Sequence, residues 1–336
     1  MPITGPSSYI PTINEFLSHW TSCNAALPPA TPFLVRLPET NTTVTQAQFL
    51  AQRDALLAQQ NVVQSSLTDH EIARGAIQIQ KATLLTSFSL FLARLDGYYR
   101  NTDFYAAAPY APSIGDGQEN FTRVLIAGIK LWEKLNAGPA PAGVTLPLVL
   151  VPGGMTVETF NNAVAALQAA YVLEQDRDQL VTIARAKRDR IQDEAYAVMK
   201  AYRENLPGSN VAQFPELVET LPRLSPTPGH TPEAVNASAV FVAPNSSRVV
   251  YEASTDTQLH SYELRGNVGE EFGSEDAVVI ATHGPNDPRE FTVPFGLNQP
   301  GAEVALKVYV ILTTGNEAGS AAMLVQRPAN VLPLAA

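Results

Sequence analysis

The sequence predicts a multidomain protein, α then β, in which a duplicated bundle of long, coiled-coil-like helices precedes a seven-stranded β-sandwich. Three observations support this prediction. Residues 49–95 recur as residues 160–206, an offset of 111 positions. Apolar residues return every seven positions along the first copy without a change of phase. From Val235 onward the apolar period shortens from 3.6 to 2, which is typical of strands.

The repeat and the proline-rich breaks set the expected domain boundaries. We expect an N-terminal arm at residues 1–11, helical repeat 1 at 12–117 and helical repeat 2 at 118–222. A Pro-rich linker at 223–233 then leads to the sandwich domain at 234–336.

The two tryptophans of the chain support the duplication. Trp20 and Trp132 precede the two long repeats at matching places, and each is followed four residues later by an asparagine, Asn24 or Asn136. Coincidence is a poor explanation for two rare residues at one point of a repeat. The first two-thirds of the chain is therefore predicted to be a tandem duplication of a helical unit.

Each copy is expected to begin with a short helix and an extended piece. In the first copy, Thr12 and Glu15 form a capping-box pattern, and Pro28 forbids continuation past Leu27. The apolar, proline-bounded pieces at 32–38 and 145–152 are expected to lie along the helices rather than inside a sheet.

A long helix then follows in each copy. Thr45 and Gln48 form a cap, and the apolar row continues unbroken (Phe49, Leu56, Val63, His70, Ile77, Leu84, Phe91). This favours one rod over a helical hairpin, although bends near Ser65 and Asp176 remain an alternative. His70, within the row, is expected to pair with Glu71 or Asp69.

Seven short runs with alternating side chains predict the strands of the sandwich: 238–242, 248–253, 260–265, 277–282, 290–293, 303–313 and 321–326. Residues 249–256, 261–264, 306–310 and 315–320 resemble a fibronectin type III domain, over about 100 residues. Tyr251 stands where that family usually has a core tryptophan, so its hydroxyl needs a partner if it is buried. The resemblance implies a binding or spacer module without catalytic residues. The layout of two helical repeats before this domain also resembles bacterial proteins with a duplicated helical N-terminal region.

Composition excludes several function classes. The net charge is −10, and the densest basic run, 185–190, is interrupted by an aspartate, so nucleic acid is not an expected partner. A single cysteine allows no intrachain disulfide. No apolar run reaches the length of a membrane span. The N-terminal residues do not resemble a secretory signal, which indicates the cytoplasm, whereas fibronectin-like domains of bacteria are often exported. The compartment therefore stays open.

No catalytic, cofactor or metal site is predicted with any force, and no cofactor is expected. Cys23 shares a helix face with His19, but a Cys–His nucleophile needs a third, orienting group, so a core thiol beside Trp20 is the expected role. An acidic loop offers weak calcium candidates, although its spacing fits no known calcium loop and a solvated loop is the simpler interpretation (Glu270, Glu271, Glu275, Asp276).

Aromatic residues gather in the connector after the first long helix, and they are the candidates for interaction with a partner (Tyr98, Tyr99, Phe104, Tyr105, Tyr110). Packing between helices is an equal alternative for them. We therefore expect a non-enzymatic structural or scaffolding protein, bound to itself as an oligomer or filament. A peptide- or glycan-binding adhesion module is the first alternative. A hydrolase, whose carboxylates meet only in the fold, is the second.

Overall fold

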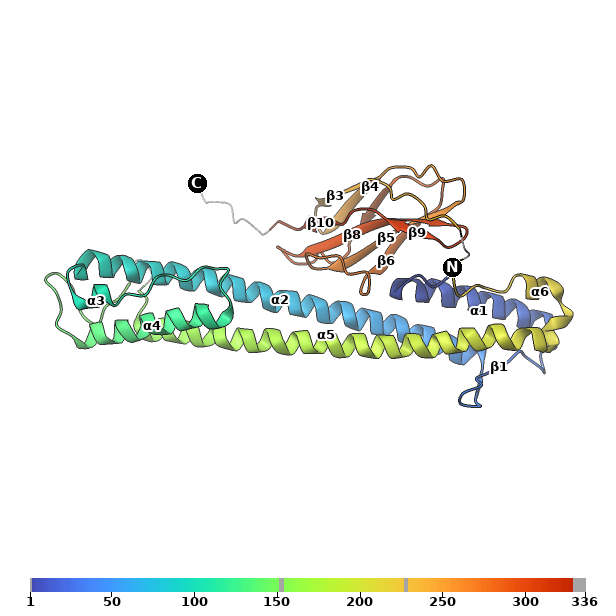
Figure 1. The fold of residues 1–336 in the computed structure, drawn as a ribbon, viewed down its shortest axis with the longest axis horizontal. Helices are drawn as coiled ribbons and strands as arrows, with labels where there is room; N and C mark the ends of the chain where they lie inside the picture. Colours follow the sequence, from blue (N-terminus) through green and yellow to red (C-terminus); the bar gives the residue numbers. More distant parts are fainter. Residues whose placement is uncertain (1, 151–153, 227–228, 329–336) are drawn as a thin grey trace. The chain divides into compact units, whose positions relative to one another are not determined.

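A computed structural model describes residues 2–150, 154–226 and 229–328 of the chain (Figure 1). The chain divides into two compact units: unit 1 contains Met1–Thr68 and Val181–Ala336, and unit 2 contains Asp69–Leu180. Both boundaries fall inside long helices, so each unit takes part of each predicted repeat. Parts of the predicted arm, second extended piece, linker and sandwich domain lie outside the described residues.

The first helix begins earlier than the sequence suggested. Helix α1 (Tyr9–Ala26) follows a 3₁₀ turn, η1 (Pro6–Ser8). Thr12 is therefore inside the helix and is not its cap: its hydroxyl donates to the carbonyl oxygen of Ser8 at 2.8 Å. The prediction took Pro11 as part of a loose arm, yet a proline is tolerated in the first turn, where its missing N–H has no intrahelical partner to lose.

Both long stretches are single helices, α2 (Gln46–Tyr99) and α5 (Val157–Asn205), and neither is a hairpin. The cap predicted for α2 is present: Gln48 N donates to Thr45 Oγ1 at 3.2 Å, and Thr45 N donates to Gln48 Oε1 at 2.8 Å. Near Ser65, where a hairpin would have bent, Thr68 donates its hydroxyl to the carbonyl oxygen of Gln64, and α2 continues.

The shorter elements complete the helical body: α3 (Asp103–Ala106), α4 (Gln118–Ala137), η2 (Leu206–Gly208), η3 (Asn210–Gln213) and α6 (Pro215–Glu219). The extended piece at 32–38 was expected to lie along the helices. Phe33 and Val35 of this piece do pack in the helical core of unit 1, and the piece also contributes β1 (Val35–Arg36), which pairs with β2 (Thr43–Val44) in an antiparallel hairpin. Asn205 of α5 holds this hairpin, because its Oδ1 accepts from Arg36 N at 3.0 Å.

Trp20 lies at the centre of the helical core of unit 1. Its indole N–H donates to the carbonyl oxygen of Phe33 at 3.0 Å, while Phe33 N donates to Asn24 Oδ1 at 2.8 Å. The indole packs on Phe49, at the start of α2, and on Tyr202, near the end of α5. The helical core of unit 1 therefore contains a residue from each long helix.

Trp132 has the same surroundings in unit 2. Its indole N–H donates to the carbonyl oxygen of Leu148 at 3.2 Å, and Leu148 N donates to Asn136 Oδ1 at 2.8 Å. The indole packs on Phe160, at the start of α5, and on Phe91, near the end of α2. In each unit, a ring from the start of one long helix and a ring from the end of the other pack on the same tryptophan.

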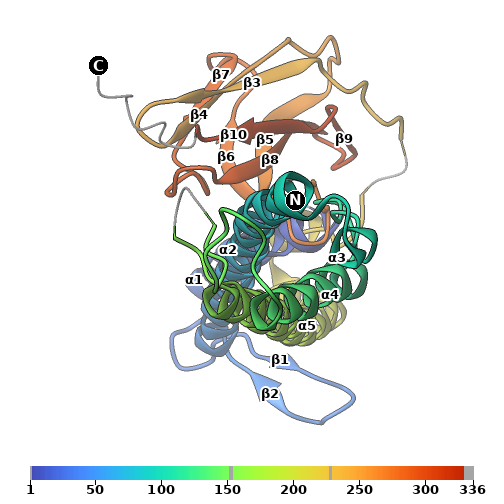
Figure 2. The ribbon, with the colours of Figure 1, turned by 90° about the vertical axis from the view of Figure 1, so that its left-hand side faces the viewer.

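The sheet-rich domain consists of two sheets, which Figure 2 shows as two layers. One sheet has the order β3-β4-β7, and the other has the order β10-β8-β5-β6, with β9 paired to β8. The strands are β3 (Ala237–Val242), β4 (Ser246–Tyr251), β5 (Leu259–Val268), β6 (Val278–His283), β7 (Glu290–Val293), β8 (Glu303–Leu312), β9 (Glu317–Gly319) and β10 (Met323–Gln326).

Each of the seven predicted strand ranges overlaps one of these strands, and β9 is the strand that the alternation did not predict. Three residues are too few to display a period of two. Tyr251 is buried in the core, and its hydroxyl has the partner it requires: His283 Nδ1 lies at 3.0 Å and the carbonyl oxygen of Pro288 at 3.3 Å.

Candidate functional site

The predicted interaction residues, at the end of α2 and in the connector that follows it, divide into two groups. Tyr99 and Phe104 turn inward, with their rings edge to face and 6.0 Å apart. Tyr98 is 42% exposed, Tyr105 is 40% exposed and Tyr110 is 95% exposed. Thus two of the five predicted interaction residues are packing residues, and three are available to a partner.

The acidic loop between β5 and β6 does not assemble a calcium site in the described residues. Across these residues no three His, Cys, Asp or Glu side chains meet in an arrangement that could hold a metal ion. Glu270, Glu271 and Glu275 are exposed to solvent, whereas Asp276 is only 8% exposed. The loop is therefore a solvated acidic segment from which one carboxylate is drawn into the protein.

Asp276 anchors this loop to the helices of unit 1, in a cluster that we name the Asp276 latch. Its carboxylate accepts from Arg188 Nη1 at 2.9 Å and pairs with Arg185. Arg188 also donates to the carbonyl oxygen of Glu275 at 2.7 Å, and Gln64 Nε2 donates to that of Asp276 at 2.8 Å. Two arginines of the basic run 185–190 therefore bind the loop of the sandwich domain to α5 within unit 1.

A buried polar trio lies beside Trp20 and provides the third group that the sequence lacked. His19 Nδ1 is 2.7 Å from the hydroxyl of Tyr202, and Cys23 Sγ is 3.5 Å from the same hydroxyl. His19 Nε2 lies 2.8 Å from the carbonyl oxygen of Leu217. Because a carbonyl only accepts, Nε2 carries the hydrogen and Nδ1 accepts from Tyr202, whose oxygen accepts from the thiol.

The electrostatics of this trio favour neutral groups. Desolvation raises the pKa of the Cys23 thiol and of the Tyr202 hydroxyl, and it lowers the pKa of His19. A nucleophilic cysteine needs the opposite, a depressed pKa and access to substrate, whereas Cys23 is fully buried. The trio is thus suited to satisfying hydrogen bonds in the core. Sequence spacing revealed the His19–Cys23 pair, but Tyr202 is 179 residues from Cys23.

A buried ion cluster lies on strand β5. Arg265 Nε donates to Glu263 Oε2 at 2.9 Å, and its two terminal nitrogens donate to Glu317 at 2.9 and 2.6 Å. The guanidinium carbon lies 4.1 Å from the ring centre of Tyr309. Burial raises the pKa of Glu263, against the opposing charge of Arg265. The alternation of apolar and polar residues along β5 did not predict this buried cluster, because the polar residues between core residues of a strand normally face water.

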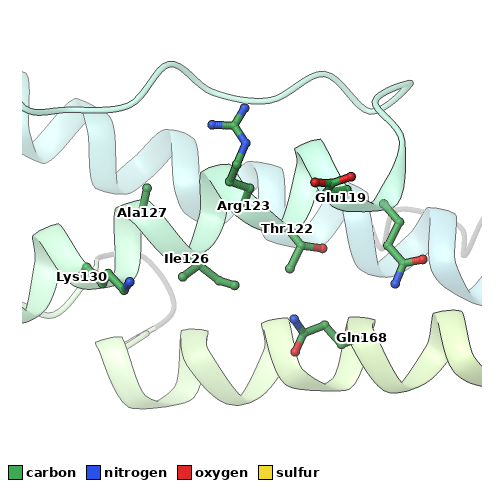
Figure 3. Close-up of a pocket in the computed structure, with 8 residues that line it drawn as sticks. Glu119, Thr122, Arg123, Ile126, Ala127, Lys130 and Gln168 are labelled. Atoms are coloured by element: carbon green, nitrogen blue, oxygen red, sulfur yellow. The ribbon is translucent and has the colours of Figure 1, made fainter.

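Unit 2 carries a shallow groove of about 690 Å³ along α4. Figure 3 shows Thr122 of α4 and Gln168 of α5 facing each other across it. Its charged residues are of both signs (Glu119, Arg123, Lys130), so the groove selects no ligand by charge.

Unit 1 carries a second groove, of about 740 Å³, between the β1–β2 hairpin and the facing sides of α2 and α5. We name it the hairpin groove. Leu37, Val44 and Ala197 contribute apolar surface, and the rim has four carboxylates but one lysine (Glu39, Asp193, Glu194, Glu204; Lys200). The groove is therefore complementary to a positively charged partner.

None of the described helices is long and apolar enough to cross a membrane. No protein-family model and no curated protein matches this sequence.

Several solved structures are similar to the C-terminal, sheet-rich region of the chain, and fibronectin type III-like domains are among them. A Fn3-like protein from Clostridium thermocellum is 20% identical, has a TM-score of 0.24, and covers 30% of this chain and 96% of its own. The fn3 domain of human contactin 1 is 15% identical, has a TM-score of 0.26, and covers 33% and 90%. A pectate lyase from Erwinia chrysanthemi is 12% identical, has a TM-score of 0.23, and covers 27% and 28%.

Proposed function

We propose that this protein is a non-enzymatic structural protein that self-associates through its helical body, with the sandwich domain as a compact contact module. The observation that carries this proposal is the exposure of Tyr98 at the end of α2 and of Tyr105 and Tyr110 in the connector that follows. Tyrosine is enriched in protein interfaces, because its ring contributes a large contact area and its hydroxyl a hydrogen bond.

We also propose that the helical body is a tandem duplication. The support is the recurrence of one hydrogen-bonding pattern, from Trp20, Phe33 and Asn24 in unit 1 and from the corresponding residues in unit 2. A body built from two similar units suits a protein whose role is to present surfaces at fixed places, and it requires no reaction centre.

Light scattering of the purified full chain tests the proposed function. The wild type is expected to have a mass above the 36.1 kDa of one chain. A variant with serine at positions 98, 105 and 110 should associate about tenfold more weakly, because the tyrosine contact area is lost. Tyr196→Ser is the matched control, since Tyr196 is 41% exposed but lies in unit 1. A wild type that stays monomeric at high concentration contradicts the proposal.

A second candidate function is peptide binding, and the hairpin groove favours it. Its apolar floor and four carboxylates suit a peptide that alternates lysine with leucine. Fluorescence anisotropy should detect binding of such a labelled peptide to the wild type. The double substitution Asp193→Asn with Glu204→Gln should weaken this binding. A glutamate–leucine peptide of equal length is the control. Equal binding of both peptides, or none, would remove this candidate.

A further inference from the structure

The outward side of α2 in unit 2 carries no charge over about five helical turns. Between Gly75 and Ala93 the sequence contains one charged residue, Lys81. Its side chain is buried, donates from Nζ to the carbonyl oxygen of Asp116 at 2.8 Å and lies 4.8 Å from the ring centre of Phe121. The solvent side of these 19 residues, about 28 Å of helix, is therefore neutral.

Apolar and small side chains occupy this side, which we name the neutral face. Ile79 is 70% exposed. The other exposed positions between Gly75 and Ala93 are small or uncharged (Gly75, Gln78, Ala82, Thr83, Thr86, Ser89, Ala93). A helix side that only meets water normally carries charged residues, so this composition indicates a partner.

The threonine hydroxyl groups of the neutral face already donate hydrogen bonds within the helix. Thr83 Oγ1 donates to the carbonyl oxygen of Ile79 at 3.0 Å, and Thr86 Oγ1 donates to that of Ala82 at 3.0 Å. Neither threonine needs water as an acceptor for its hydroxyl hydrogen. Dehydrating this face therefore costs less than its polar residues alone would suggest.

Unit 1 provides an internal comparison. The segment 186–204 of α5 has the corresponding place there, because Tyr202 packs on Trp20 as Phe91 packs on Trp132. That segment contains nine charged residues, whereas 75–93 contains one. The fold of the unit therefore does not require a neutral outer side, and the neutral face of α2 needs a separate explanation.

We infer that the neutral face is the docking surface for a second copy of this chain, whose own neutral face packs against it. This inference rests on the proposed function and names the surface that performs it. Each chain carries a net charge of −10, so two copies repel each other least where both surfaces are uncharged. Small residues such as Ala82 let two helices approach closely, and Ile79 supplies apolar area to bury.

Sedimentation velocity of the full chain tests this inference. Ile79→Glu and Thr83→Lys change the net charge in opposite directions, yet each places a charge in the contact. Each should therefore raise the dissociation constant more than about tenfold. Leu57→Glu, on an exposed apolar residue of α2 in unit 1, is the matched control and should associate like the wild type. Circular dichroism should give the wild-type helix signal for all three variants.

Mixing the two variants identifies the partner surface. The glutamate and lysine variants in equal amounts should recover association, because opposite charges then meet across the contact. If the wild type associates and both variants do so equally well, the neutral face is not the contact, while the proposed function stands. A monomeric wild type overturns both. If the wild type is monomeric and sediments with phosphatidylcholine vesicles while Ile79→Glu does not, the face binds lipid and the inference is wrong.

Discussion

The indole N–H of Trp20 donates to the carbonyl oxygen of Phe33 at 3.0 Å and fixes the chain that follows α1 against the helical core. Asn24 holds the same residue from the other side, because its Oδ1 accepts from Phe33 N at 2.8 Å. The backbone of one buried residue is thus bonded on both sides by side chains of one helix. Trp132 and Asn136 form the corresponding two hydrogen bonds with the backbone of Leu148.

Removing either asparagine should destabilise the protein by a similar amount. Asn24→Ala and Asn136→Ala each leave a backbone N–H without its acceptor, so we expect each to lower the free energy of unfolding by about 1–3 kcal/mol. Urea unfolding measures this. Asn61→Ala, at an exposed position of α2, is the control and should change the free energy by less than about 0.5 kcal/mol. A loss of stability in only one of the two variants would argue against equivalent roles for Asn24 and Asn136.

Acid should destabilise the protein through His19. Burial lowers the folded-state pKa of His19 below its ordinary value of 6.5, so the unfolded chain binds the proton more readily. The stability contribution is complete above about pH 6.5 and is lost as the pH falls through the folded-state pKa. Thermal unfolding between pH 7.5 and 5 should reveal this decline. His19→Gln should flatten it, whereas His260→Gln, at an exposed residue, should leave it unchanged.

Breaking the Asp276 latch should destabilise the protein more than a substitution at an exposed acidic residue of the same loop does. Asp276→Asn removes one of the two carboxylates that pair with the buried guanidinium of Arg188, and Asp189 remains as the other. We therefore expect a loss of about 1–3 kcal/mol in the free energy of unfolding. Glu275→Gln, on an exposed side chain of the same loop, is the matched control and should be nearly neutral. Equal effects of the two substitutions would show that the latch contributes nothing specific.

Two glycines of the helical body should respond to alanine in opposite ways. A Cβ at Gly128 of α4 would collide with the ring of Phe88, so Gly128→Ala should destabilise by about 1–3 kcal/mol. A Cβ at Gly75 of α2 meets no atom within 4 Å, so Gly75→Ala should stabilise by about 1 kcal/mol through helix propensity. Urea unfolding of both variants checks the signs, and a stabilising Gly128→Ala would contradict the packing.

Local patterns predicted the elements well, and long-range partners account for what they missed. The Thr45 cap and the uninterrupted apolar row predicted α2, because both signals lie within a few residues of their effect. His70 was expected to pair with Glu71 or Asp69, and its ring does lie 3.8 Å from the Glu71 carboxylate. Its nearer partner is Glu174 at 3.1 Å, which is 104 residues away on α5 and could not be predicted from local sequence. Similarly, nothing near Asp276 indicates that Arg188 would bind it.

The predicted interaction residues show the same limit. Five connector aromatics look alike in sequence, but only the fold decides that Tyr99 is buried while Tyr110 is exposed. The segment from Gly75 to Ala93 contains a single charged residue, and only the fold shows that this residue, Lys81, is buried.

The most direct test of the account is to divide the chain in the connector between Tyr110 and Ala111 and to recombine the halves. Each fragment contains one tryptophan, and each lacks a ring that covers it: Trp20 loses Tyr202, and Trp132 loses Phe91. We predict red-shifted tryptophan emission from each isolated fragment, and a blue shift with formation of a one-to-one complex on mixing. Blue-shifted emission from the separate fragments, with no complex on mixing, would contradict a body in which each unit is built from both proposed repeats.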